Sequence, residues 1–264
     1  MKNWLLLTFL TMTFITRPEP AIATELTINY TFTAQILNRG PQVNKLNIKV
    51  NDNLLRGDAV EGPPEVMQSY LLFDNTTKKA WTVKPSRKAY APLPPISRLI
   101  PDMLEQDPRF KNLPPEQREM LQKMLGGSPK TTGAPKKQVT YEPSDESQQH
   151  GSWSCKVYIL KVDGKPAAKA CIVPWGTAGI SRGDLAIFTE FAGYVSSRSE
   201  KDSTRDWSQA PGIPIWTKSA EGISPSYESE IVKMNKSSAS DSSSFKLPQG
   251  YQQIGLAELY SPAK

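Results

Sequence analysis

The chain has 264 residues, a formal net charge of +6 and 38% hydrophobic residues. This length suffices for one large domain. The mild positive charge is spread along the chain, which favours a solvated surface, with contact to anionic lipid headgroups as the alternative. Two cysteines and one histidine are too few for a metal-ligand cluster, so we expect neither a metal site nor another cofactor.

The first 23 residues have the composition of an export signal. Lys2 gives a basic start, residues 4–15 are apolar apart from threonines, and residues 21–23 (Ala-Ile-Ala) match a signal-peptidase site. The apolar core of about 12 residues is too short to cross a bilayer as a helix. We therefore expect cleavage near Ala23 and an exported, periplasmic or extracellular protein. Such a protein is not an integral membrane protein and has no nucleic-acid partner.

Alternating apolar and polar residues predict a meander of strands at the start of the mature chain. In residues 26–37, Ile28, Tyr30 and Phe32 share one face, while polar residues occupy the other. Ile48 lies on the apolar face of the next strand. Further strands are predicted between turn signals, at residues 46–50, 54–60, 66–73, 79–83 and 87–92.

The periodicity becomes helical between residues 96 and 125, with an interruption at Pro101. Three methionines lie on the apolar stripes of this helical insertion: Met103, Met120 and Met124. Residues 128–137 are rich in Ser, Pro, Lys, Thr and Gly, and we interpret them as a mobile linker. A second helical segment is predicted at residues 182–199, with Phe188 on its apolar stripe.

The two cysteines are predicted to form a disulfide across one hairpin. Strands are predicted to resume at Val139 and to continue through this hairpin to Trp175. A strand from Cys155 leads to Asp163-Gly164, a strong hairpin signal, and residues 167–173 return. A turn centred there pairs residue 155 with a partner near 172, close to Cys171. An isolated cysteine pair normally bonds in an oxidising compartment, and the spacing is not that of a redox-active Cys-x-x-Cys motif.

A last hairpin is predicted from residues 213–218 and 227–236, followed by a short terminal segment at 245–254. The whole pattern predicts a mainly β (α+β) domain over residues 24–264, with about ten or eleven strands in one curved antiparallel sheet or half-open β-barrel. The helices must bury their apolar stripes, and the concave face of the sheet is the surface large enough to receive them. We expect them to act as lids.

Residues typical of catalysis do not form a recognisable pattern. His150 lies in a segment of Ser, Gln and Gly, and we interpret it as a solvated loop side chain. No phosphate-binding loop or dinucleotide fingerprint occurs. We therefore expect that the protein is not an enzyme.

Several short motifs resemble those of a known group of exported proteins. They are FDNTTKKAWTVKP at 73–85, WSCKVY at 153–158, GIPI at 212–215 and FKLPQGY at 245–251. Their order, with the export signal and the helical insertion, resembles the lipoprotein-localisation-carrier (LolA/LolB-like) superfamily, closest to a bacterial domain family of unknown function within it. The resemblance implies a half-open β-barrel whose helices cover an apolar cavity that holds acyl chains. No arginine is located that matches the carriers' cavity latch. Arg56, on an early strand, is the candidate for such a part, and a surface position is the favoured alternative.

Two functions remain open. The first is an exported soluble protein that binds a hydrophobic small molecule, a lipid or acyl chain, in the concave cavity. The second is an envelope structural or regulatory protein that binds another protein and has a filled cavity. An apolar void of about 300–1,000 Å³ would favour the first function, and a close-packed interior the second. We expect a monomer in either case. The candidate cavity residues are Tyr30, Phe32, Ile48, Met103, Met120, Met124 and Phe188.

Overall fold

The computed structural model describes residues 24–36, 40–63, 67–95, 113–117, 138–195, 209–223, 226–238 and 242–261. The predicted export signal and the linker at 128–137 lie outside these residues. So does the predicted helical insertion at 96–125, apart from residues 113–117. The three candidate methionines of that insertion are therefore still predictions.

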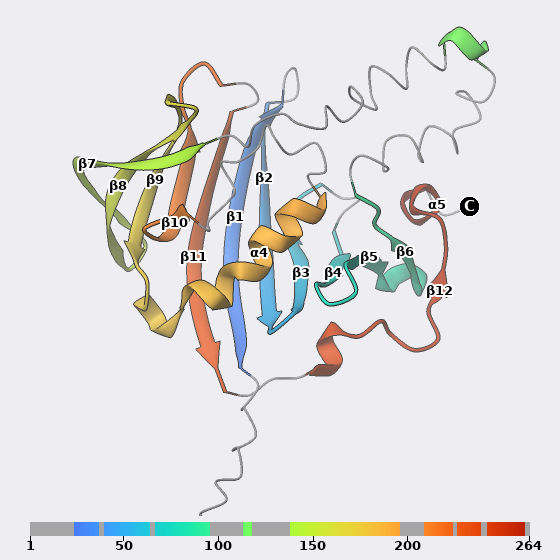
Figure 1. The fold of residues 1–264 in the computed structure, drawn as a ribbon. Coiled ribbons are helices and arrows are strands. Elements are labelled where there is room, and N and C mark those ends of the chain that lie inside the picture. Colours follow the sequence, from blue (N-terminus) through green and yellow to red (C-terminus); the bar gives the residue numbers. More distant parts are fainter. Residues whose placement is uncertain are drawn as a thin grey trace, which may run out of the picture.

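One curved, open sheet dominates the described part of the chain (Figure 1). It has 12 strands in the order β12-β6-β5-β4-β3-β2-β1-β11-β10-β9-β8-β7. Neighbouring strands are antiparallel, except that β12 runs parallel to β6. The strands are β1 Glu25–Ile36, β2 Gly40–Asn51, β3 Leu54–Glu61, β4 Tyr70–Asp74, β5 Lys79–Lys84, β6 Ala89–Pro92, β7 Val139–His150, β8 Trp153–Val162, β9 Lys165–Pro174, β10 Gly212–Ser219, β11 Tyr227–Ser237 and β12 Gln252–Gln253.

This architecture confirms the predicted mainly β fold with a curved antiparallel sheet. Eleven strands correspond to predicted segments, and the additional one is the two-residue β12, inside the predicted terminal segment. The first meander and the later strands form a single sheet because β1 pairs with β11 along ten residues, from Glu25↔Ser237 to Ala34↔Tyr227. That pairing joins segments about 200 positions apart in the sequence.

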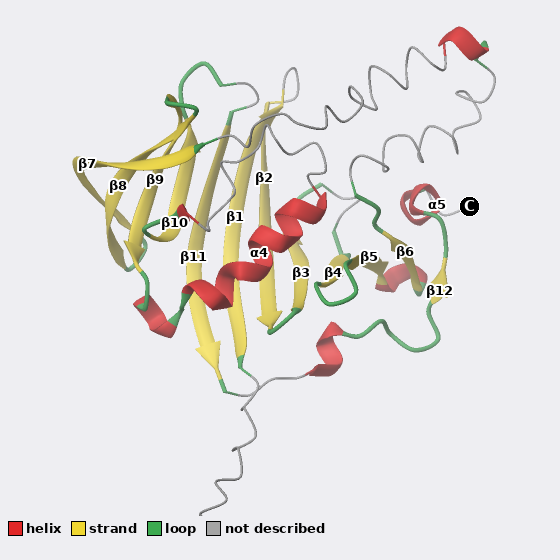
Figure 2. Cartoon of the chain, in the orientation of Figure 1, coloured by secondary structure: helices red, strands yellow, loops and turns green. Residues whose placement is uncertain are grey.

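Helix α4, Arg182–Val195, crosses one face of the sheet in front of β11, β1, β2 and β3 (Figures 1 and 2). Its start is fixed by Asp184, whose Oδ2 accepts hydrogen bonds from the Ser181 backbone N–H at 2.8 Å and hydroxyl at 2.7 Å. Lys236 of β11 donates to the same carboxylate at 2.9 Å, which ties the helix to the sheet. The other described helical segments are short: η1 Pro85–Arg87, η2 Thr177–Gly179, η5 Ser242–Phe245 and α5 Leu256–Tyr260.

The main core lies between this helix and the sheet. Leu185 and Ile187 of α4 are buried against sheet residues such as Ile213 and Ile215 of β10. Further along the helix, the Phe191 ring packs on Phe73 of β4, with ring centroids 5.2 Å apart. Burial of the apolar stripe of α4, as predicted, therefore determines which face of the sheet the helix covers.

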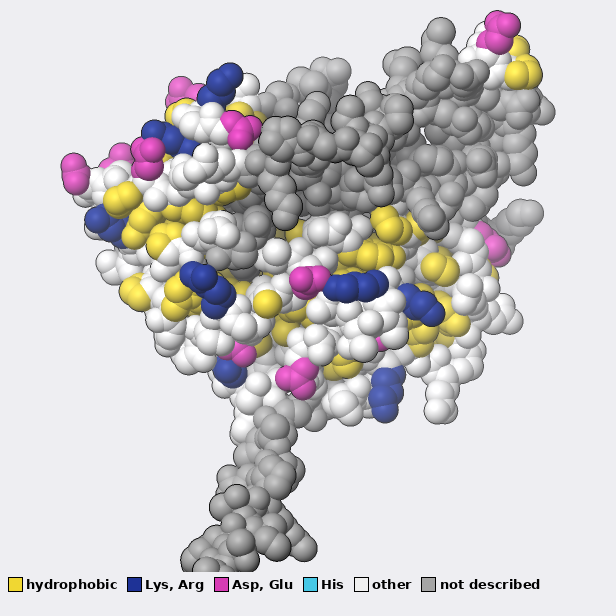
Figure 3. Space-filling view, viewed as in Figure 1, with side chains coloured by type: hydrophobic (Ala, Val, Ile, Leu, Met, Phe, Trp, Pro, Cys, Tyr) yellow, Lys and Arg dark blue, Asp and Glu magenta, His cyan; other side chains and the backbone are white. Residues whose placement is uncertain are grey.

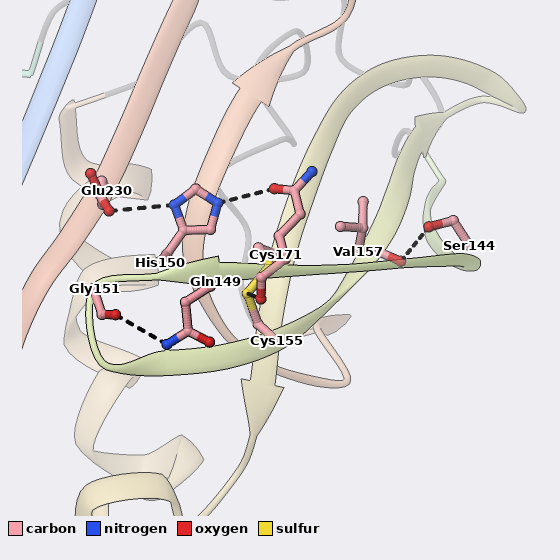
Figure 4. Close-up of a disulfide and its surroundings, with 9 residues drawn as sticks. Ser144, Gln149, His150, Gly151, Cys155, Val157, Cys171 and Glu230 are labelled. Atoms are coloured by element: carbon pink, nitrogen blue, oxygen red, sulfur yellow. Dashed lines mark hydrogen bonds and ion pairs between the residues drawn. A yellow bond between two sulfur atoms is a disulfide. The ribbon is translucent and has the colours of Figure 1, made fainter.

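Cys155 and Cys171 form the predicted disulfide, with Cα atoms 5.5 Å apart (Figure 4). The register differs slightly from the prediction, because an irregularity between Leu160 and Lys161 shifts the pairing. As a result, Cys171 lies opposite Val157, and the bond joins cysteines that are diagonal to each other on β8 and β9.

The prediction for His150 is wrong. This residue ends strand β7, and its ring stacks on Trp216 with centroids 5.0 Å apart. Its ring nitrogens lie 3.0 Å from Gln148 Oε1 and 3.4 Å from Glu230 Oε1 (Figure 4). The error arises because β7 is an edge strand of mostly polar residues, so its sequence has no apolar alternation to distinguish it from a loop.

Candidate ligand-binding cavity

A cavity of about 500 Å³ lies between the sheet and α4. Six strands and the helix contribute its wall, and most of the wall is apolar. The described residues that line it are Ile28, Tyr30, Phe32, Asn44, Leu46, Ile48, Leu55, Gly57, Ala59, Glu61, Leu71, Phe188, Phe191, Ala192, Thr217, Tyr227, Ser229 and Ile231.

The strand register arranges many of these residues in rows that run across the sheet. One row, here called the apolar row, contains Ile28 opposite Ile48, then Gly57, then Leu71 on β4. Side chains of a strand alternate between its faces, so the next row on the same face lies two residues along each strand. That row, here called the middle row, contains Ile231, Tyr30, Leu46 and Ala59.

Two residues further along each strand lies a third row, here called the polar row, which contains Thr217, Ser229, Phe32 and Asn44. Thr217 lies opposite Ser229, and Ser229 lies opposite Phe32. Phe32 lies opposite Asn44. On β3 a register irregularity follows Ala59, and Glu61, which also borders the cavity, lies opposite Lys45 and is ion-paired to it. Apart from Phe32, the residues of the polar row carry hydroxyl or amide groups. The wall of the cavity therefore changes from apolar to polar along the strand direction.

Aromatic side chains lie at both the polar end and the apolar end of the cavity. Near the polar row, Phe32 stacks with Tyr227, with ring centroids 6.3 Å apart. Beyond the apolar row, Phe191 of α4 packs on buried Phe73, which lies opposite Leu55. The helix thus covers the apolar end. In the space-filling view of this side, hydrophobic side chains show between the charged ones (Figure 3).

Four of the candidate residues come together in this cavity: Tyr30, Phe32, Ile48 and Phe188. Sequence reasoning missed the contributions of β3, namely Leu55, Gly57 and Ala59, and the polar side chains that complete the wall. The alternation of residues 55, 57 and 59 was visible, but small residues at two of these positions gave only a weak apolar signal. No local sequence pattern indicated that Thr217 and Ser229 lie in the same row of the sheet as Asn44.

Arg56 lies on the opposite face of the sheet from the cavity, since its neighbours Leu55 and Gly57 line the cavity. Rather than being a simple surface residue, it is half-buried. Its guanidinium donates to Asp58 at 2.6 Å and to the Ser244 carbonyl oxygen at 2.8 Å, and stacks 3.9 Å from the Tyr70 ring centroid. Burial opposes the charge, but the hydrogen bond and charge of Asp58 keep the pKa of Arg56 above its ordinary value. Arg56 therefore holds the C-terminal segment against β3.

Two further findings concern the described residues alone. Among them, no group of three or more His, Cys, Asp or Glu side chains is placed to hold a metal ion. None of their helices is both long enough and apolar enough to cross a membrane.

No protein-family model matches the chain, and neither does any curated protein. Similar solved structures include an uncharacterized conserved protein from Thermus thermophilus, with 8% identity, a TM-score of 0.43, and coverage of 89% of this chain and 91% of that one. A LolA superfamily protein from Nitrosomonas europaea has 9% identity, a TM-score of 0.31, and coverage of 81% and 84%. A domain from Vibrio parahaemolyticus described as a "putative outer membrane lipoprotein-sorting protein domain" has 7% identity, a TM-score of 0.36, and coverage of 85% and 89%.

Proposed function

We propose that this protein is an exported carrier that binds a hydrophobic ligand, a lipid or acyl chain, in the cavity between the sheet and α4. The observation that carries the proposal is the cavity itself. Its volume of about 500 Å³ falls within the range of about 300–1,000 Å³ that is usual for small-molecule pockets. Protein interiors are otherwise close-packed, with few voids larger than a water molecule. A void of this size therefore favours a ligand over the alternative of a filled interior.

The composition of the wall supports an apolar ligand. Aliphatic and aromatic side chains provide the apolar and middle rows, and α4 adds Phe188 and Phe191. Transfer of an acyl chain from water gains about 0.8 kcal/mol per buried methylene, so about ten methylenes gain roughly 8 kcal/mol. Association costs about 4–15 kcal/mol in lost translational and rotational freedom, which is comparable with this gain. A cavity whose side chains are already ordered before binding avoids a further entropic cost and therefore binds the ligand more tightly.

Export is supported by two independent features of the chain. The first is the basic, apolar and small-residue pattern of residues 1–23, with its Ala-Ile-Ala site. The second is the Cys155–Cys171 disulfide, a bond that persists in oxidising compartments such as the periplasm and is rare in the cytosol. We propose that the mature protein begins at Thr24 and works in the periplasm.

Titration with N-phenylnaphthylamine, an uncharged apolar fluorescent probe, tests ligand binding. The decisive variant is Ala59→Trp, which places an indole into the cavity from the middle row. Its matched control is Val60→Trp, because Val60 follows on the same strand but is 57% exposed. We expect the wild type and Val60→Trp to bind the probe with equal affinity and Ala59→Trp to lose binding. Equal binding by both folded variants, or no binding by the wild type, would overturn the proposal.

A further inference from the structure

The polar row of the cavity has a chemical character that narrows the class of ligand. Thr217, Ser229 and Asn44 offer two hydroxyls and an amide, groups that both donate and accept hydrogen bonds. These three side chains are half-buried and come from three different strands. Thr217 and Ser229 lie directly opposite each other on neighbouring strands, so a hydroxyl-rich head group could bond to both at once, whereas Asn44 lies two strands from Ser229.

The charges around this row do not favour an anion. Among the described lining residues the one ionisable carboxylate is Glu61, and no lysine or arginine side chain lines the cavity. The ammonium of Lys45 is bound to Glu61 Oε2 at 2.5 Å, so this cation is already paired with a carboxylate. An anionic head group placed at the polar row would therefore lose water without gaining a cation from the described wall.

The same ion pair reduces the attraction of the row for a cation. Glu61 and Lys45 together carry no net charge, and both side chains are about half exposed, at 54% and 51%. Their field is therefore screened by solvent. With anionic and cationic head groups both disfavoured, an uncharged head group that forms hydrogen bonds fits this end of the cavity best.

The rows also fix the direction in which a ligand would lie. Residues in a strand advance about 3.3 Å each, so the polar row is roughly 13 Å from the apolar row, four residues away. Phe191 packs on Phe73 beyond the apolar row, and α4 therefore covers that end. An amphiphile gains most when its chain lies under α4 and its head group lies at the polar row.

We infer that the cavity selects an amphiphile with an uncharged, hydroxyl-rich head group, such as an acyl ester of a polyol, over a free fatty acid of the same chain length. This inference rests on the proposed carrier function and specifies its ligand. The acyl chain lies along the apolar and middle rows. The head group exchanges hydrogen bonds with Thr217 and Ser229, which lie directly opposite each other.

Competition for bound N-phenylnaphthylamine tests this selectivity. The competitors share one chain: 1-monolauroylglycerol is uncharged, laurate is an anion at pH 8, and lauroylcholine is a cation. We expect monolauroylglycerol to displace the probe at a concentration at least about tenfold lower than either charged competitor, a difference of about 1.4 kcal/mol. Laurate or lauroylcholine competing as well as, or better than, monolauroylglycerol would overturn the inference but leave the carrier function intact. A wild type that binds neither the probe nor any of the three ligands would overturn both.

A charge placed in the polar row provides a second, independent measurement. Ser229→Lys adds a cation to the cavity wall, whereas Val232→Lys adds the same charge at a position of β11 that is 53% exposed. We expect Ser229→Lys to improve laurate binding relative to monolauroylglycerol by about tenfold or more, and Val232→Lys to leave the ratio unchanged. An unchanged ratio in folded Ser229→Lys, or equal shifts in both variants, would contradict the placement of the head group.

Discussion

Replacing Phe188 with aspartate should remove ligand binding while leaving the sheet intact. Phe188 of α4 lines the cavity and is half-buried, and it packs against the main core cluster, so the proposed ligand would contact its remaining surface. A fully buried phenylalanine contributes about 1.5–3 kcal/mol, and a carboxylate in an apolar wall adds a desolvation cost. Because the ring is already half-buried, a ligand covers only the remaining half, so loss of that contact alone costs about 0.75–1.5 kcal/mol and weakens binding by roughly 3- to 13-fold. The desolvation cost of the carboxylate adds to this loss.

The control for this variant is Ala186→Asp, which introduces the same charge on an exposed position of the same helix. The assay is titration with N-phenylnaphthylamine, and circular dichroism verifies that both variants keep the strand-rich fold. We expect Ala186→Asp to match the wild type. If folded Phe188→Asp binds the probe as tightly as Ala186→Asp, α4 does not form a wall of the binding site and the reasoning is refuted.

Three predictions concern stability. Replacing Cys155 and Cys171 with alanine should lower the free energy of unfolding by about 3 kcal/mol, measured with urea, and no change would contradict a stabilising disulfide. Gly212→Ala should lower the free energy of unfolding by about 1–3 kcal/mol or more, because a Cβ there would lie 2.1 Å from the Val173 carbonyl oxygen. An unchanged unfolding midpoint would contradict this close approach of the two strands. Burial opposes ionisation of Asp184, but hydrogen bonds from its neighbours hold its pKa below the ordinary 3.8. The ionised carboxylate therefore stabilises the fold above pH 3.8, and this stabilisation is lost as the pH falls through the folded-state pKa. Asp184→Asn should therefore have a lower free energy of unfolding than the wild type at pH 7, and the difference should disappear in acid below pH 3.8. A difference in free energy of unfolding that does not depend on pH would contradict this role of Asp184.

Much of the fold could be predicted from the sequence because its signals are local. The alternation of Ile28, Tyr30 and Phe32 identifies one strand and the face that it buries. The Asp163-Gly164 turn places the two cysteines within reach of each other, and the apolar stripe predicted over residues 182–199 identifies α4, whose described part ends at Val195. Each of these features depends on residues close together in the chain, where periodicity and turn chemistry are informative.

The remainder depends on contacts between distant segments. Pairing of β1 with β11 brings Ser229 beside Phe32, and local patterns carry no information on that choice. The polar row exists only once this pairing and the neighbouring registers are set. Strand β7 was partly missed for a different reason, since its polar sequence around His150 is stabilised by stacking on Trp216 rather than by apolar alternation.

Native mass spectrometry of the protein tests the central claim most directly. The full chain is expressed in a host that exports it, and the mature protein is purified from the periplasm without detergent or added lipid. We expect a disulfide-bonded chain beginning near Thr24 that carries an uncharged acyl compound, released on collisional activation, and an Ala59→Trp variant that carries none. Wild-type protein found only at the mass of the bare chain, or equal ligand on the wild type and Ala59→Trp, would contradict it.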